Sequence, residues 1–240
     1  RDLWRPVRAL VPPGRPGDDL NHRRRRQERI DPVAGHIWYI QSVSDPDYTR
    51  GYVPRPDPAL TSRENRKPRL KVLHRARIGE PVAPQDLPET YVLKPSHPAH
   101  RLDVPLWFNS FIHVRDDMVK VLRRFDLGAT VLRPIRVELG DGRGVDTRYA
   151  TLLTSNVRPT IDPDASEWVG YGAVQRSALR SERGVHPCVR AFPSVREGPA
   201  IWTDPEVAKT VFVNDDLAQA LLSEPFANQL HLVQVPFSKD

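Results

Sequence analysis

Two stretches of this chain, Val114–Leu122 (VRDDMVKVL) and Val213–Leu221 (VNDDLAQAL), repeat one pattern 99 residues apart. In each copy a short β-type run precedes a pair of aspartates, and an apolar helical pattern follows them. Aspartates suit the first turn of a helix because the N–H groups and the helix dipole there favour negative charge. The repeat therefore predicts two strand–helix–strand units, near residues 107–139 and 210–237, in which the aspartates serve the architecture.

The residues that follow the first copy predict further regular structure. The helix is expected over Asp116–Phe125, with Met118, Val121, Leu122 and Phe125 on one apolar face, and Gly128 is expected to end it. A strand from Val131 to Leu139, the turn Gly140–Gly144 and a second strand over Arg148–Val157 predict a β-hairpin. The fold class predicted is α+β, with a mixed sheet, short helices and two copies of the strand–helix–strand unit.

The part of the chain before these elements is less regular. Proline makes up 25 of the 240 residues, about twice the usual share of roughly 5 %, which predicts short elements and no long helix. Short strands are expected at Ile37–Ile40, Leu70–Leu73 and Tyr91–Leu93. The predicted organisation is a basic Pro/Arg-rich arm over residues 1–30, an irregular segment with short strands over 31–90, and an α+β domain over 91–240.

Composition and charge narrow the class of protein. No run approaches the roughly 20 apolar residues of a membrane-spanning helix, and Cys188 is the single cysteine, so a cytoplasmic protein without an internal disulfide is expected. Residues 1–100 hold 19 Lys and Arg against 12 Asp and Glu, a net charge of +7, whereas the remaining residues hold 17 against 18, a net charge of −1. The basic character therefore belongs to the N-terminal part.

Three stretches carry a resemblance to a known family. They are the strand–helix–strand pattern of Phe111–Val137, the run Tyr149–Leu153 with Asn156-Val157 and Ile161–Ser166 after it, and the closing repeat Val211–Phe237. Through them the region Tyr91–Phe237 resembles the immunity protein eleven family of bacterial polymorphic toxin systems. Members of that family usually place Ser at the first helix cap, where this chain has Arg115, so Asp116 is expected to support that helix start.

The resemblance implies an antitoxin that binds and neutralises a cognate toxin. The genes of such an antitoxin and its toxin are often adjacent, and several family members neighbour nuclease toxins. The resemblance implies no enzyme activity, cofactor or metal. The loop from Asp164 to Gly198 loses sequence regularity while it accumulates aromatic and basic residues, which are enriched in interface hot spots. We therefore predict that the toxin-binding residues are Trp168, Tyr171, Arg176 and Arg180, with an anchoring role in the core as the alternative for Trp168.

Other combinations of reactive residues favour structural interpretations. His97 and His100 flank Pro98, which argues against a metal-binding helix, and His186 and Cys188 are too close in a proline-containing segment to face each other as base and nucleophile. The glycines of Gly140–Gly144 lack the Lys-Ser/Thr of a phosphate-binding loop.

The competing hypothesis is a nucleic-acid-binding accessory protein that uses the cluster Arg23–Arg26. Four consecutive arginines can contact phosphates, but the nearest downstream aromatic residue is Trp38, and readout of bases needs interleaved aromatics or a recognition helix. A partner-binding arm is therefore favoured over nucleic-acid recognition, and membrane binding is not expected. A basic inhibitor would not mimic nucleic acid; it would block the toxin elsewhere or oppose an acidic surface of it.

Overall fold

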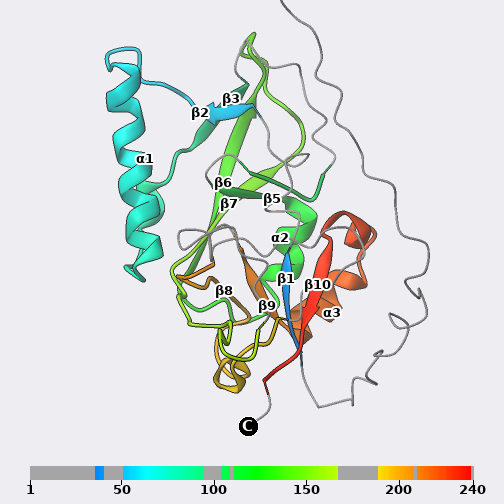
Figure 1. Cartoon of the computed structure of the whole chain (residues 1–240). Coiled ribbons are helices and arrows are strands. Elements are labelled where there is room, and N and C mark those ends of the chain that lie inside the picture. Colours follow the sequence, from blue (N-terminus) through cyan, green and yellow to red (C-terminus); the bar gives the residue numbers. More distant parts are fainter. Residues whose placement is uncertain are drawn as a thin grey trace, which may run out of the picture. The chain divides into compact units, whose positions relative to one another are not determined.

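A computed structural model of the chain describes residues 36–40, 51–93, 104–108, 111–166, 189–207 and 210–238. All of these residues belong to one compact unit, Gly35–Asp240. Within the described residues this unit contains three α-helices and two β-sheets (Figure 1), which confirms the predicted α+β class.

The smaller sheet is built around the second repeat copy. Its four strands are β10 (Leu232–Val235), β1 (Ile37–Ile40), β9 (Phe212–Asn214) and β8 (Ile201–Trp202), in that order, and all neighbours are antiparallel. Helix α3 (Asp215–Leu222) connects β9 to β10. These two strands lie on opposite sides of β1 (Figure 1), so the N-terminal strand β1 occupies the middle of a sheet that the C-terminal repeat builds.

The larger sheet contains the first repeat copy in the same arrangement. Its order is β2 (Tyr52–Pro54), β3 (Thr90–Leu93), β6 (Thr130–Glu138), β7 (Tyr149–Thr154), β5 (Ile112–Arg115) and β4 (Leu106–Phe108). Helix α2 (Asp116–Leu122) connects β5 to β6, and β7 lies antiparallel between these two strands. The predicted β6–β7 hairpin is confirmed. The sheet is mixed, because β3 pairs with β6 in parallel.

The pairing registers of the two sheets correspond residue by residue. Val114 lies opposite Leu106 in one sheet, and Val213 lies opposite Ile201 in the other. One position along, Trp107 pairs with His113, and Trp202 pairs with Phe212; both tryptophans are fully buried. The two copies are therefore equivalent beyond the helices that the sequence repeat reveals. Each also has a preceding strand, β4 or β8, that carries a buried tryptophan.

Both repeat helices contribute to one hydrophobic core. This core contains Met118, Val119, Val121 and Leu122 from α2, Leu217, Ala218 and Leu221 from α3, and residues of both sheets that include Val114, Leu152, Ile201 and Val213. Met118 and Leu217 are each the third residue of their helix, and each is 0 % exposed. These two residues therefore occupy matching core positions, and the two helices are also in contact with each other.

The two helices begin by different means. In α3 the side chain of the N-cap residue Asn214 accepts a hydrogen bond from the N–H of Leu217 at 2.9 Å. In α2 the N-cap residue Arg115 gives no such bond; its guanidinium binds Asp117, which also accepts from the N–H of Met118 at 2.8 Å. The support that was expected from Asp116 thus comes from Asp117, because Asp116 forms an ion pair with Lys120 one turn later.

The segment predicted as irregular contains the longest helix of the described chain, α1 (Ser62–Arg77), with 16 residues. The expectation of a strand at Leu70–Leu73 and of no long helix is wrong. Thr61 and Glu64 form a capping box that starts α1, and Pro68 is accommodated inside it on the exposed side. Three short 3₁₀ helices complete the described elements: Pro84–Asp86, Pro193–Val195 and Ala227–Gln229.

Residues before position 90 belong to the same fold as those after it. β1 pairs with β9 and β10, and β2 pairs with β3. Helix α1 packs through Val72 and Ala76 into a cluster with Phe111 and Leu153. Strands from both sides of residue 90 therefore share sheets.

Candidate functional site

The residues predicted to contact a toxin, Trp168, Tyr171, Arg176 and Arg180, lie outside the described residues. The same holds for His97 and His100, for His186 and Cys188, and for Arg23–Arg26. The structure does describe the two ends of the loop segment that contains the four residues. Ser166 accepts a hydrogen bond from the N–H of Arg190 at 3.0 Å, and the N–H of Asp162 donates to the carbonyl of Arg190 at 2.9 Å. Ser166 and Arg190, at the two ends of that segment, therefore lie next to each other.

The aspartates of the repeats hold the backbone and neighbouring side chains. Asp215 accepts a 2.8 Å hydrogen bond from the indole of Trp38, which fastens α3 to the central strand β1. Burial opposes ionisation of Asp117, but the hydrogen bonds from Arg115 and from the Met118 N–H outweigh it and lower the pKa of this carboxyl. Within the described residues, no three His, Cys, Asp or Glu side chains come together as a metal site would require.

The polar residues of the family-like stretches also serve the architecture. Asn156 donates to the carbonyls of Leu127 and Ile201, each at 2.8 Å, and accepts from the N–H of Ala129 at 2.8 Å. It therefore connects the start of β6 in one sheet to β8 in the other. Asp162 accepts from the N–H groups of Asp164 and Ala165 and closes a turn.

A buried aromatic cluster lies on the larger sheet, on the face away from α2. His113 is 0 % exposed; its ring stacks on Trp107 with centroids 3.9 Å apart and packs in a T-shaped arrangement with Tyr91, with centroids 4.3 Å apart. Its Nδ1 lies 3.1 Å from the Thr151 hydroxyl. Burial lowers the pKa of His113 well below its usual value, so the ring is neutral at physiological pH. The cluster is enclosed and forms part of the core.

Helix α1 carries a concentration of positive charge that the sequence reasoning overlooked. Its 16 residues include Arg63, Arg66, Lys67, Arg69, Lys71, Arg75 and Arg77 and one acidic residue, Glu64. Seven positive charges minus one give +6, which equals the formal net charge of the whole chain. The Thr61–Glu64 capping pattern before this run could have indicated a helix, but Pro68 and the expectation of a short strand obscured it.

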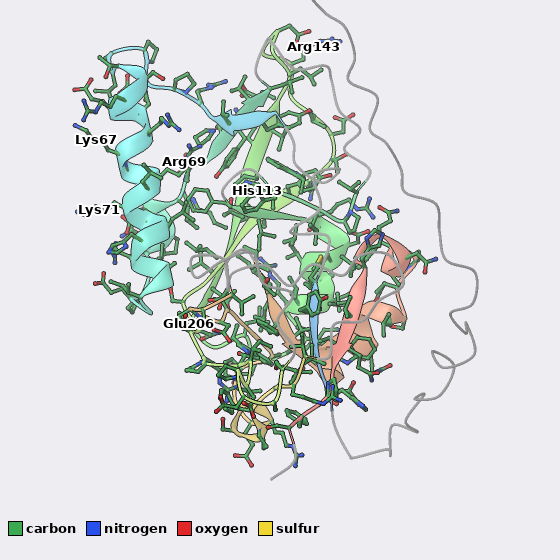
Figure 2. The ribbon with its side chains drawn as sticks, viewed as in Figure 1. Lys67, Arg69, Lys71, His113, Arg143 and Glu206 are labelled. Atoms are coloured by element: carbon green, nitrogen blue, oxygen red, sulfur yellow. The ribbon has the colours of Figure 1, made fainter. Side chains whose placement is uncertain are left out.

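The basic residues of α1 divide between its two sides. Arg75 binds Glu80 at 3.2 Å and Asp86 at 2.8 Å, and so joins the end of the helix to the following loop. Arg69 is half-buried and points toward the larger sheet (Figure 2). Burial raises the pKa of Tyr91, and the nearby charge of Arg69 offsets a small part of that rise. Lys67 and Lys71 point away from the sheet (Figure 2) and are exposed, as Arg63 is. In the described part of the chain these three side chains form no ion pair.

Comparison with known proteins adds no assignment to this geometry. No family model matches the chain, and no curated protein matches it. In the part of the chain that the structure describes, no helix has the length and apolar character needed to cross a membrane.

Proposed function

We propose that this protein is an immunity protein that binds a cognate bacterial toxin and neutralises it without catalysis. The observation that supports this proposal is the position of the family-like residues. The three stretches fall on β5–α2–β6, on β7 with the turns after it, and on β9–α3–β10, which together build the shared core. A resemblance that covers the core of a fold argues for a related architecture, and the binding function then rests on the family-level analogy.

The chemistry of the described residues agrees with a binding protein. Asp117, Asn156 and Asp162 hold helix starts and turns, and His113 is enclosed by aromatic rings. Polar groups with such structural duties have little freedom to act on a substrate. Two regions are candidates for partner contact: the exposed side of α1 and the four residues Trp168, Tyr171, Arg176 and Arg180, which stay a prediction.

The test is binding to the product of the adjacent gene. An inactive form of that protein should bind the full chain in calorimetric titration with one-to-one stoichiometry, and co-expression should protect cells from the active form. Absence of both binding and protection would refute the proposal.

A nucleic-acid-binding accessory protein is the second candidate, because α1 alone contributes a charge of +6. For that function the chain should bind duplex DNA or RNA with an affinity that falls steeply with salt, since each phosphate contact releases counterions. Binding to the adjacent gene product that persists at moderate salt, without such nucleic-acid binding, would favour the immunity protein.

A further inference from the structure

The outer face of α1 combines charge with exposed apolar side chains. Arg63, Lys67, Leu70 and Lys71, together with Ile78 at the C-cap, recur at intervals that place them on one side of a helix with 3.6 residues per turn. The opposite side carries Val72 and Ala76, which are buried against the larger sheet. The helix is therefore held by one face, and the other faces solvent in the described structure.

The apolar residues on this face are unusual for the molecule. Four large hydrophobic side chains are exposed among the described residues, and three belong to α1 or its ends: Leu60 at 43 %, Leu70 at 56 % and Ile78 at 56 %. Single exposed leucines are normal on protein surfaces, but a group of them among cations on one helix marks a binding surface.

The pattern distinguishes between kinds of partner. A phosphate backbone would bind Arg63, Lys67 and Lys71 but would leave Leu70 and Ile78 in contact with water. An acidic protein surface with apolar residues among its carboxylates would pair with the cations and bury the two aliphatic side chains as well. The combination therefore favours a protein over a nucleic acid.

We propose that the outer face of α1, defined by Arg63, Lys67, Leu70, Lys71 and Ile78, is the docking surface for an acidic, partly apolar face of the toxin. This inference rests on the proposed function, because it assigns the partner of that function to a surface. The cations accelerate encounter and orient the partner, and the aliphatic side chains slow its dissociation. The surface is already ordered as a helix, so docking there needs little ordering of the backbone.

The first experiment reverses charge on the full chain. The double variant Lys67→Glu/Lys71→Glu is compared with Arg123→Glu/Arg136→Glu, which makes the same charge change at two exposed positions outside α1. By calorimetry and stopped-flow mixing with the inactive toxin, the α1 variant should bind at least roughly tenfold more weakly, mainly through slower association. The control variant should change affinity less than about threefold, and equal melting temperatures should show that both variants fold.

The second experiment tests the apolar part. Leu70→Gln and Ile78→Gln keep the charge and suit a helix, and each should raise the dissociation rate constant of the toxin complex by roughly fivefold or more. A 20-base-pair DNA duplex serves as the nucleic-acid probe, and its binding should be insensitive to either substitution.

The outcomes separate the surface from the function. If the parent chain binds the toxin and the α1 variants bind it equally well, the docking surface is wrong and the proposed function stands. If the parent chain does not bind the toxin, both proposals fall. If Lys67→Glu/Lys71→Glu reduces duplex binding while toxin binding is unchanged, α1 is a nucleic-acid surface and the inference is overturned.

Discussion

At the scale of single residues, Asn156 is the polar side chain that connects the two repeat copies. Its amide bonds to backbone groups of Leu127, Ala129 and Ile201, and it also lies within 3.2 Å of the Thr130 hydroxyl. Gly128 has a φ of 53°, and a Cβ there would lie 2.8 Å from the Asn156 Oδ1. The glycine thus ends the segment after α2 and also makes room for this side chain.

We predict that Asn156→Ala lowers the free energy of unfolding by about 2–4 kcal/mol, because it leaves several backbone groups without their partner. Urea denaturation followed by circular dichroism measures the change. Asn228→Ala is the matched control, since Asn228 is exposed and should cost less than about 0.5 kcal/mol. Equal free energies of unfolding for the two variants would show that water can replace the hydrogen bonds of the Asn156 amide at no cost in stability.

His113 gives a second prediction at this scale, which concerns pH. Its folded-state pKa lies well below 6.5, so the unfolded chain takes up a proton at this residue before the folded chain does as pH falls. Stability is therefore lost below about pH 6.5, at up to about 1.4 kcal/mol per pH unit for this one group. Phe212 occupies the equivalent position in the other sheet, which makes His113→Phe the natural variant.

The measurement is the free energy of unfolding of the parent and of His113→Phe at pH 7.5, 6.5 and 5.5. The difference between them should shift in favour of the variant as pH falls from 6.5 to 5.5. The other titrating groups are common to both proteins and cancel in the difference. A difference that does not change with pH would mean that His113 becomes protonated in the folded protein.

At the scale of elements, the sequence was informative where one local pattern dominated. The helices α2 and α3 follow from paired aspartates and apolar spacing, and the β6–β7 hairpin follows from two strand patterns around a glycine-rich turn. The pairing of β1 between β9 and β10 could not be predicted, because it joins residues nearly 200 positions apart and leaves no local signal.

Helix α1 was missed for a physical reason. Pro68 normally costs an interior helix about 3 kcal/mol, which argues against a helix across Leu70–Leu73. The capping box and the packing of Val72 and Ala76 against Phe111 and Leu153 outweigh that cost. The candidate docking surface was missed together with the helix, since its residues share a face only in the helical conformation.

Pro68→Ala should therefore stabilise the protein, because it restores a backbone N–H within α1 and Pro68 is exposed. We expect a gain of about 1–3 kcal/mol, measured as a raised melting temperature together with increased helical circular dichroism. Pro84→Ala is the control; Pro84 begins a 3₁₀ helix, where proline is favourable, so this change should give no gain. A neutral Pro68→Ala variant would indicate that the helix already bends around the proline without cost.

At the scale of the whole molecule, the central question is whether the two sheets fold separately or together. Leu221 of α3 is 0 % exposed and belongs to the same core as Met118 and Leu122 of α2. The two repeat copies thus bury their helices in one hydrophobic core. The Asn156 side chain also links them, because it binds the carbonyls of Leu127 and Ile201. Neither sheet would retain a complete core if the other unfolded.

We therefore predict that Leu221→Asp unfolds both repeat copies in one step. An uncompensated carboxylate in this core costs several kcal/mol, which is a large part of the stability of an ordinary domain. Near-ultraviolet circular dichroism reports on the buried Trp107 of one sheet and Trp202 of the other, and both signals should disappear together. Leu222→Asp is the matched control, since Leu222 is 40 % exposed and its substitution should leave the melting temperature within a few degrees of the parent. A Leu221→Asp protein that keeps a cooperative transition with part of the near-ultraviolet signal would show instead that the larger sheet folds without its partner.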